Sequence, residues 1–189
     1  QGANPEYIIE HLLRKNGIGF EGTSEDDVTL EFKADASALT AVWAAEPDAV
    51  IIAPAPASSA ICMKYPGSKK VLDLSDEWDK VNNGFGLMMG FLIASSDFCE
   101  SHKTEVNDFL REYEDSITAV AADPQAAGVL CEKYGIAANA ALAEKAIPDC
   151  HLCCITGSEL KYAVTTYFQI LYDADPSSIG AMPDDGIWY

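Results

Sequence analysis

The sequence predicts an α/β fold with a parallel or mixed sheet. Short runs of strand length alternate with stretches of helical length through about the first 84 residues, an order typical of α/β layers. One of these runs, at residues 49–53, is continuously apolar, as in a strand that is covered on both faces. Hydrophobic residues make up 49% of the 189-residue chain, which is enough for a core.

The first predicted element is a helix that starts at the N-terminus. Asn4 is a suitable N-cap residue, Pro5 suits the first helical position, and Asn16-Gly17 is a typical helix end. A glycine turn at Gly2 runs directly into this helix, and such a turn usually follows a strand. We therefore expect either that the chain is a fragment or that its first helix has lost the strand that would precede it.

The rest of the first half alternates strands and helices. Apolar or alternating runs predict strands at residues 28–33, 49–53 and 70–74. Helical patterns predict helices at residues 36–45 and 58–63 and a helix start at residues 75–80.

The second half is mostly helical. A glycine-rich stretch at 82–86 precedes a strand-like run at 87–94, and residues 150–155 form a second possible strand. Helices are predicted at residues 97–122, 124–134, 138–146 and 158–172. The helices at 97–122 and 158–172 each carry a wide apolar stripe, which requires a partner surface.

Several segments, in the same order, resemble substrate-binding proteins of ABC importers, of the nitrate/sulfonate/taurine type that includes binders of thiamine precursors. These segments are Gln1–Tyr7, Asp48–Pro56, Val71–Trp78, Gly90–Phe98, Glu132–Ile136, Glu144–Pro148 and Pro176–Asp185. Together they span nearly the whole chain, but they match only the later part of a family member.

The resemblance implies a periplasmic-binding-protein-like (type II) α/β lobe at residues 1–84, without its first strand. Residues 85–189 would hold the return crossing and C-terminal helices of the other lobe. The implied function is to bind a small organic or inorganic anion or a heterocycle in an interlobe cleft, by hinge closure and without covalent chemistry. The implied partners are an ABC transporter permease and either the missing N-terminal lobe or a second copy. The implied location is extracytoplasmic, periplasmic or lipid-anchored, with the signal segment absent from this chain.

The first candidate binding site is the start of the first helix. The free N–H groups at Gly2, Ala3 and Asn4, with the positive end of the helix dipole, suit an anionic ligand. A purely structural role, in which Asn4 only caps its own helix, is also consistent with the pattern. The resemblance, which turns this end toward the cleft, favours the binding role.

The second candidate is the turn after the run at 49–53. Ligands of open α/β folds bind at the carboxyl ends of strands, where Pro54, Ala55, Ser58 and Ser59 would lie. The two serine hydroxyls can donate hydrogen bonds to a ligand. A proline-rich strand exit with a serine cap would show the same residues.

The third candidate is the stretch from Gly84 to Gly90, the presumed return crossing, where Gly84 and Gly86 are possible hinge residues. Phe85, Met88 and Met89 are predicted to line the cleft, although the two methionines would equally suit packing in the core.

The fourth candidate is the cysteine segment. Cys150, His151, Cys153 and Cys154 have a spacing that could hold zinc or iron, and a thiamine-pyrimidine-synthase-like enzyme of the same superfamily uses such a segment. In a strand, however, neighbouring cysteines face opposite sides. The same residues are also compatible with a disulfide or with buried free thiols. We predict that these residues hold no metal, that the protein has no cofactor and that it is not an enzyme. A further hypothesis is that the chain is a cytoplasmic effector-sensing domain, because regulators also use the two-lobed fold.

The net charge of the chain bears on the kind of partner it can bind. The chain has 30 acidic and 12 basic residues, a formal charge of −18, which argues against nucleic-acid binding. An anionic ligand is still possible, because a local site can oppose the global charge.

Overall fold

The computed structural model describes residues 2–46, 48–83 and 86–188. It divides into two compact units, which we describe separately. Unit 1 comprises residues 2–32, 72–101 and 155–188, and unit 2 comprises residues 33–71 and 102–154. The predicted domain boundary at residues 84 and 85 lies outside the described residues and stays a prediction.

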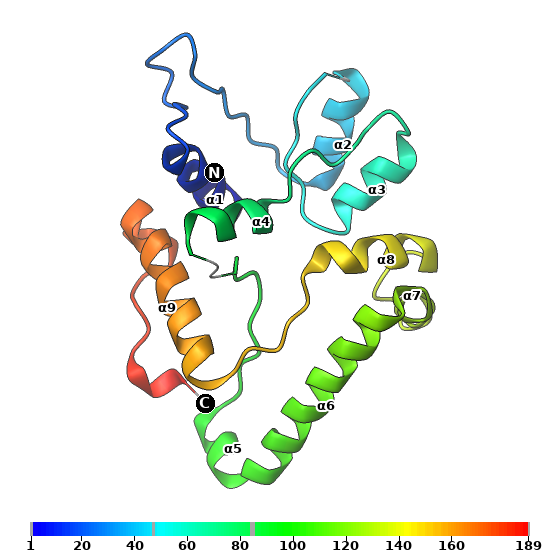
Figure 1. The fold of residues 1–189 in the computed structure, drawn as a ribbon, viewed down its shortest axis with the longest axis vertical. Helices are drawn as coiled ribbons and strands as arrows, with labels where there is room; N and C mark the ends of the chain where they lie inside the picture. The colour runs from blue at the N-terminus through cyan, green and yellow to red at the C-terminus, as the bar shows by residue number, and fades with distance from the viewer. Residues whose placement is uncertain (1, 47, 84–85, 189) are drawn as a thin grey trace. The chain divides into compact units, whose positions relative to one another are not determined.

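The described residues form α-helices and short 3-10 helices joined by loops (Figure 1). In unit 1 these are α1 (Asn4–Lys15), α4 (Leu74–Val81), α5 (Ser96–Ser101), α9 (Gly157–Ala174), η2 (Pro176–Ser178) and η3 (Asp185–Ile187). In unit 2 they are α2 (Ala36–Ala45), α3 (Ala57–Lys64), α6 (Lys103–Ala122), α7 (Pro124–Lys133), α8 (Ala140–Ala146) and η1 (Ile147–Cys150).

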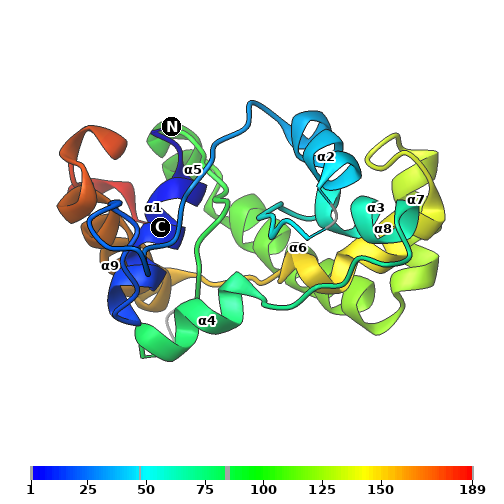
Figure 2. The same cartoon turned by 90° about the horizontal axis from the view of Figure 1, so that it is seen from above.

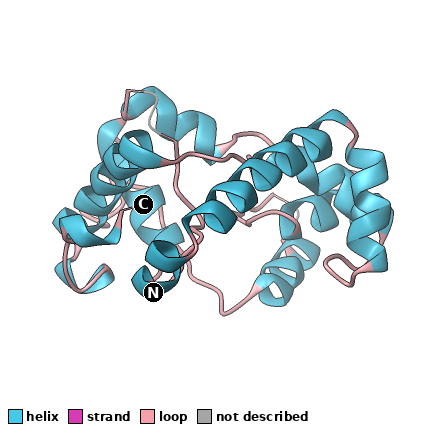
Figure 3. Ribbon diagram, turned by 90° about the horizontal axis from the view of Figure 1, so that it is seen from below, coloured by secondary structure: helices cyan, strands magenta, loops and turns pink. Residues whose placement is uncertain are grey.

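The predicted α/β fold is wrong, because the part of the chain that the structure describes is all-helical. Figure 3 shows helices and loops and no strand. The runs expected to be strands, at 28–33, 49–53, 70–74, 87–94 and 150–155, are loops or helix ends. Val50 is 84% exposed and Ile93 is 94% exposed, so two of these runs carry apolar side chains that no other element covers. An apolar pattern predicts where a side chain is buried, but a strand also needs a hydrogen-bonded neighbour.

The core of unit 1 forms where α1 packs against α9 and α4 (Figure 1, Figure 2). Trp78 of α4 is 1% exposed and meets the ring of Tyr167 of α9 edge to face, with centroids 5.6 Å apart. Tyr7, Ile8 and Leu12 of α1 join this cluster because their spacing places them on one side of the helix. The apolar residues that recur at helical spacing within residues 4–15 thus form the buried face of α1.

Unit 2 is held mainly by the contact of α7 with α8, and α3 also packs on α8 (Figure 1, Figure 2). Gly128 of α7 is buried against α8: a Cβ atom there would lie 2.6 Å from the carbonyl oxygen of Ala140. The absent side chain lets the two helix backbones approach closely.

The helix predictions are largely confirmed. The bounds of α2 are those predicted, and Pro124 begins α7. The predicted helix at 97–122 is two helices, α5 and α6, separated at His102. The first helix begins at Asn4, so Ala3 rather than Asn4 is its N-cap.

The apolar stripes of the two long helices differ in burial. Val164, Tyr167 and Leu171 of α9 are buried, whereas no residue of α6 is buried. The stripe on α6 therefore keeps much of its surface exposed, and the predicted partner or second copy stays a prediction. None of the described helices has the length and apolar character that a membrane crossing requires.

Candidate functional site

Unit 2 contains a cavity of about 280 Å³ that includes two of the predicted site residues. It is lined by Ser58, Ser59, Cys62, Met63, Lys70, Lys145 and Asp149. The lining residues come from α3, from the loop after it, and from the α8–η1 segment. The cavity thus depends on three stretches of chain, the last of which is far from the other two in sequence.

The α3 helix supplies the hydroxyl groups. It begins at Ala57, after Pro54-Ala55-Pro56, and its first turn is formed when the Ser58 N–H donates to the Pro54 carbonyl at 3.1 Å. Positions 58, 59, 62 and 63 lie on one helical face because three or four residues complete a turn. Ser59 is only 8% exposed, and neither serine hydroxyl has a hydrogen-bond partner among the described residues. Both hydroxyls can therefore turn toward a ligand.

The α8–η1 segment supplies one cation and one anion. Asn139 caps α8 by accepting a hydrogen bond from the Leu142 N–H at 2.9 Å, which fixes the start of the helix. Ala143 and Ala146 are buried in the packing of α8. Lys145 and Asp149 are four residues apart and both line the cavity. The packing of α8 therefore sets the position of both charges.

The charges in the cavity do not cancel. The Lys70 ammonium is paired with Asp149, with Nζ 2.6 Å from Oδ1. Lys145 has no carboxylate within ion-pair distance among the residues that the structure describes. Two ammonium groups and one carboxylate leave a local charge of +1 in a chain of formal charge −18. The unpaired Lys145 ammonium, beside two serine hydroxyls, is a suitable partner for an anionic oxygen.

The N-terminus of α1 differs from the predicted anion site. The N–H of Gly2 donates to the carboxylate of Glu6, from the first turn of the same helix. The Glu6 carboxylate thus engages one of the three N–H groups that we expected to bind an anion, and the binding roles of Ala3 and Asn4 stay predictions. Gly2, Ala3 and Asn4 belong to unit 1, whereas the cavity belongs to unit 2.

None of the other predicted site residues that the structure describes is among the residues that line the cavity. Pro54 and Ala55 precede α3 in unit 2 and do not line the cavity. Met88 is 8% exposed and packs in the core of unit 1, as the core-packing interpretation predicts. Met89 is exposed, and Phe85 and Gly84 lie outside the described residues. Their roles in binding stay predictions.

The cysteine segment contains free thiols. Cys150 ends η1 instead of lying in a strand, and His151 follows it in the left-handed region at φ 46°. Partial burial, and then the charge of Asp149, raises the pKa of Cys150, while partial burial and Glu114 raise that of Cys154. The described residues contain no group of three or more His, Cys, Asp or Glu side chains that could hold a metal. Thiols with a raised pKa are poor nucleophiles and weak metal ligands at neutral pH.

Sequence reasoning found the serines of the cavity but missed its charged residues, Lys70, Lys145 and Asp149. A partial signal was present, because lysines are scarce in this chain and positions 145 and 149 are one helical turn apart. The contact between α3 and α8 that brings them to Ser58 and Ser59 has no local sequence signal.

Comparison of the chain with protein-family models, with curated proteins and with solved structures found no match.

Proposed function

We propose that the chain is a solute-binding protein that holds a small organic or inorganic anion in the cavity of unit 2. In this proposal it serves an ABC importer outside the cytoplasm and delivers the anion to a membrane permease, without covalent chemistry. The importer role rests on the ordered sequence segments that resemble that family. The binding role rests on the cavity and its charges.

The observation that carries the binding proposal is the unpaired Lys145 ammonium beside Ser58 and Ser59. A hydrogen bond to a charged group contributes about 1.5–3 kcal/mol, more than one between neutral groups. Distant carboxylates oppose this attraction only weakly, since charges more than about 8 Å apart are largely screened at physiological salt. The local charge therefore decides which ligand the cavity accepts.

The size of the cavity limits the ligand. Sites for drug-sized molecules measure about 300–1,000 Å³, and this cavity of about 280 Å³ lies just below that range. The anionic group contacts Lys145 and the two hydroxyls. The side chains of Cys62 and Met63 offer an apolar wall for a short carbon chain.

The binding proposal is tested by calorimetric titration of the 189-residue protein with sodium nitrate and sodium ethanesulfonate. Choline chloride serves as the control ligand of opposite charge. We expect one of the two anions to bind, and Lys145→Met to weaken that binding at least tenfold, as expected for the loss of a charged hydrogen bond of about 1.4 kcal/mol or more.

The matched control is Lys103→Met, which makes the same change of charge at the start of α6, away from the cavity lining. A double Ser58→Ala, Ser59→Ala variant tests the hydroxyls, with a smaller loss expected. If Lys145→Met and Lys103→Met bind the anion equally well, or if neither anion binds, the cavity is not the site.

The importer role requires a separate test. It predicts an export signal in the coding sequence before Gln1 and recovery of the expressed protein outside the cytoplasm. Recovery of the full-length protein in the cytoplasm would refute the importer role and leave the binding result intact.

A further inference from the structure

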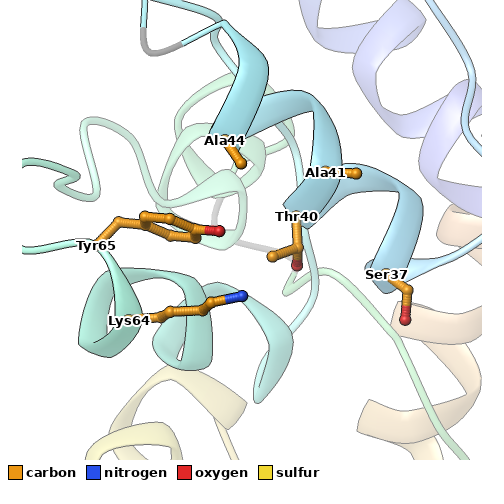
Figure 4. A pocket seen from close by; sticks show the side chains of 6 residues that line it. All are labelled: Ser37, Thr40, Ala41, Ala44, Lys64 and Tyr65. Carbon is orange, nitrogen blue, oxygen red and sulfur yellow. The ribbon is translucent and has the colours of Figure 1, made fainter.

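A second cavity, a groove open to solvent, lies within unit 2 between α2 and the C-terminal end of α3, and it shares no residue with the first. It measures about 420 Å³ and is lined by Ser37, Thr40, Ala41, Ala44, Lys64 and Tyr65 (Figure 4). Four of its six lining residues, Ser37, Ala41, Ala44 and Lys64, are exposed. We propose that this cavity binds a small polyhydroxylated anion, such as a sugar phosphate.

The α2 face that lines the cavity consists of small side chains. Ser37, Thr40, Ala41 and Ala44 recur at helical spacing, so they lie on one face of α2. None of these side chains is long enough to fill the space in front of the helix. Lys64 and Tyr65 line the opposite side, at the end of α3 (Figure 4). The local sequence of α2 therefore keeps the cavity open.

The cavity carries a positive charge without a compensating carboxylate. None of its six lining residues is acidic, in a chain with 30 acidic and 12 basic residues. Lys64 has no carboxylate partner among the described residues, and its Nζ lies 5.1 Å from the centre of the Tyr65 ring. A cation held over a ring is only partly neutralised. The Lys64 ammonium is thus available to a phosphate or carboxylate oxygen.

The hydroxyl groups add polar partners of two kinds. The Thr40 hydroxyl donates to the Ala36 carbonyl at 2.8 Å, so it presents only an acceptor to the cavity. The Ser37 and Tyr65 hydroxyls have no hydrogen-bond partner among the described residues and can both donate and accept. In Figure 4 the polar ends of Thr40, Lys64 and Tyr65 face the same space. This set suits a ligand that carries hydroxyl groups beside its anionic group.

The size distinguishes the two cavities. About 420 Å³ lies within the range of about 300–1,000 Å³ that is typical of small-molecule sites, whereas the first cavity is smaller. A bare inorganic anion would leave most of the second cavity unfilled and its hydroxyls without partners. The ligand therefore combines an anionic group for Lys64 with hydroxyls for Thr40 and Tyr65.

The test is a heteronuclear NMR titration of the ¹⁵N-labelled 189-residue protein with glucose 6-phosphate, glucose and sodium phosphate. We expect glucose 6-phosphate to shift the amide signals of residues 37–44 and 64–65, and to bind at least tenfold more tightly than glucose or phosphate. Shifts confined to other residues would overturn the proposal. Equal affinity for phosphate and glucose 6-phosphate would also overturn it, because the hydroxyls would then contribute nothing.

Two variants make the charge argument specific. Lys64→Met is expected to weaken binding of glucose 6-phosphate at least tenfold. Lys69→Met makes the same charge change outside the cavity lining and is expected to leave binding unchanged. Equal binding by these two variants refutes the role of Lys64.

Thr40→Val, which keeps the shape of the side chain but removes the hydroxyl, gives a second result if Lys64→Met fails to fold. We expect it to weaken binding of glucose 6-phosphate severalfold, and unchanged binding overturns the role of the hydroxyls. Because Lys145→Met alters only the first cavity, it should not affect these shifts, so failure of this proposal is distinguishable from failure of the anion site.

Discussion

Replacing Gly128 with alanine should weaken the helix pair that positions Lys145. A Cβ atom at position 128 would lie 2.6 Å from the carbonyl oxygen of Ala140 and 3.1 Å from the backbone nitrogen of Glu144, whereas ordinary contacts begin at 3.4 Å. Both neighbours are backbone atoms of α8, so neither can rotate away as a side chain would. The added methyl group must therefore push α7 and α8 apart.

The expected magnitude combines two opposing effects. Alanine is favoured over glycine inside a helix by about 1 kcal/mol, which stabilises α7. Overpacking of a close contact typically costs about 1–3 kcal/mol, and the contact here is with backbone atoms, which places it in the upper part of that range. We expect the unfolding free energy of unit 2 to fall by about 1–2 kcal/mol. A displaced α8 should also weaken anion binding by moving Lys145.

The assay is urea unfolding followed by circular dichroism, with amide signals of residues 124–146 used to assign the change to unit 2. Gly67→Ala is the matched control in the same unit, because a Cβ atom at position 67 would meet no atom within 4 Å. We expect this control to be neutral or slightly stabilising. A Gly128→Ala variant as stable as the natural protein would refute the close packing of α7 on α8.

Two predictions concern unit 1. The Tyr167 hydroxyl is buried without a hydrogen-bond partner among the described residues, and burial raises the pKa of Tyr167 to about 12. Tyr167→Phe should therefore raise the unfolding free energy by about 1 kcal/mol in urea titrations, whereas a loss of stability would show that the hydroxyl is bonded. Burial also lowers the pKa of His11 in the folded state, despite the 3.0 Å hydrogen bond between His11 Nε2 and Asn82 Oδ1, which raises it. The stability that neutral His11 contributes is present above its unfolded pKa of about 6.5 and is lost as the pH falls through the lower folded value. His11→Gln should flatten the stability profile between about pH 7 and pH 5, and an unchanged slope would contradict this assignment.

The helices could be predicted because their signals are local. Asn16-Gly17 ends α1, where Gly17 adopts φ 69°, a conformation that glycine adopts without strain. Pro124 begins α7, and Asp123 caps it by accepting from the Ala126 N–H. Each of these signals acts within four residues of the helix end, so the sequence alone is enough to place them. The break at His102 was missed because neither glycine nor proline stands there to mark a helix end.

The predicted strands failed because pairing is a property of two segments. The run at residues 49–53 is apolar and β-branched, and a covered strand is a reasonable prediction for it. Its burial depends on whether another segment supplies hydrogen bonds at its edge. No strand forms within the described residues, and Val50 stays exposed. An apolar, β-branched pattern therefore indicates that a segment can form a strand when a second segment pairs with it, but it does not show that such a segment is present.

The candidate site follows the same division between local and distant information. Ser58 and Ser59 could be found because they lie just after an apolar run, at the start of a short helix. Lys145 and Asp149 could not, because they reach the cavity only through the packing of α3 on α8. The formal charge of −18 argued against nucleic acid but gave no information about a site that a few side chains determine. In an acidic chain the unpaired lysines are the informative residues, since each one that lines a cavity marks a place where an anion can replace the missing carboxylate.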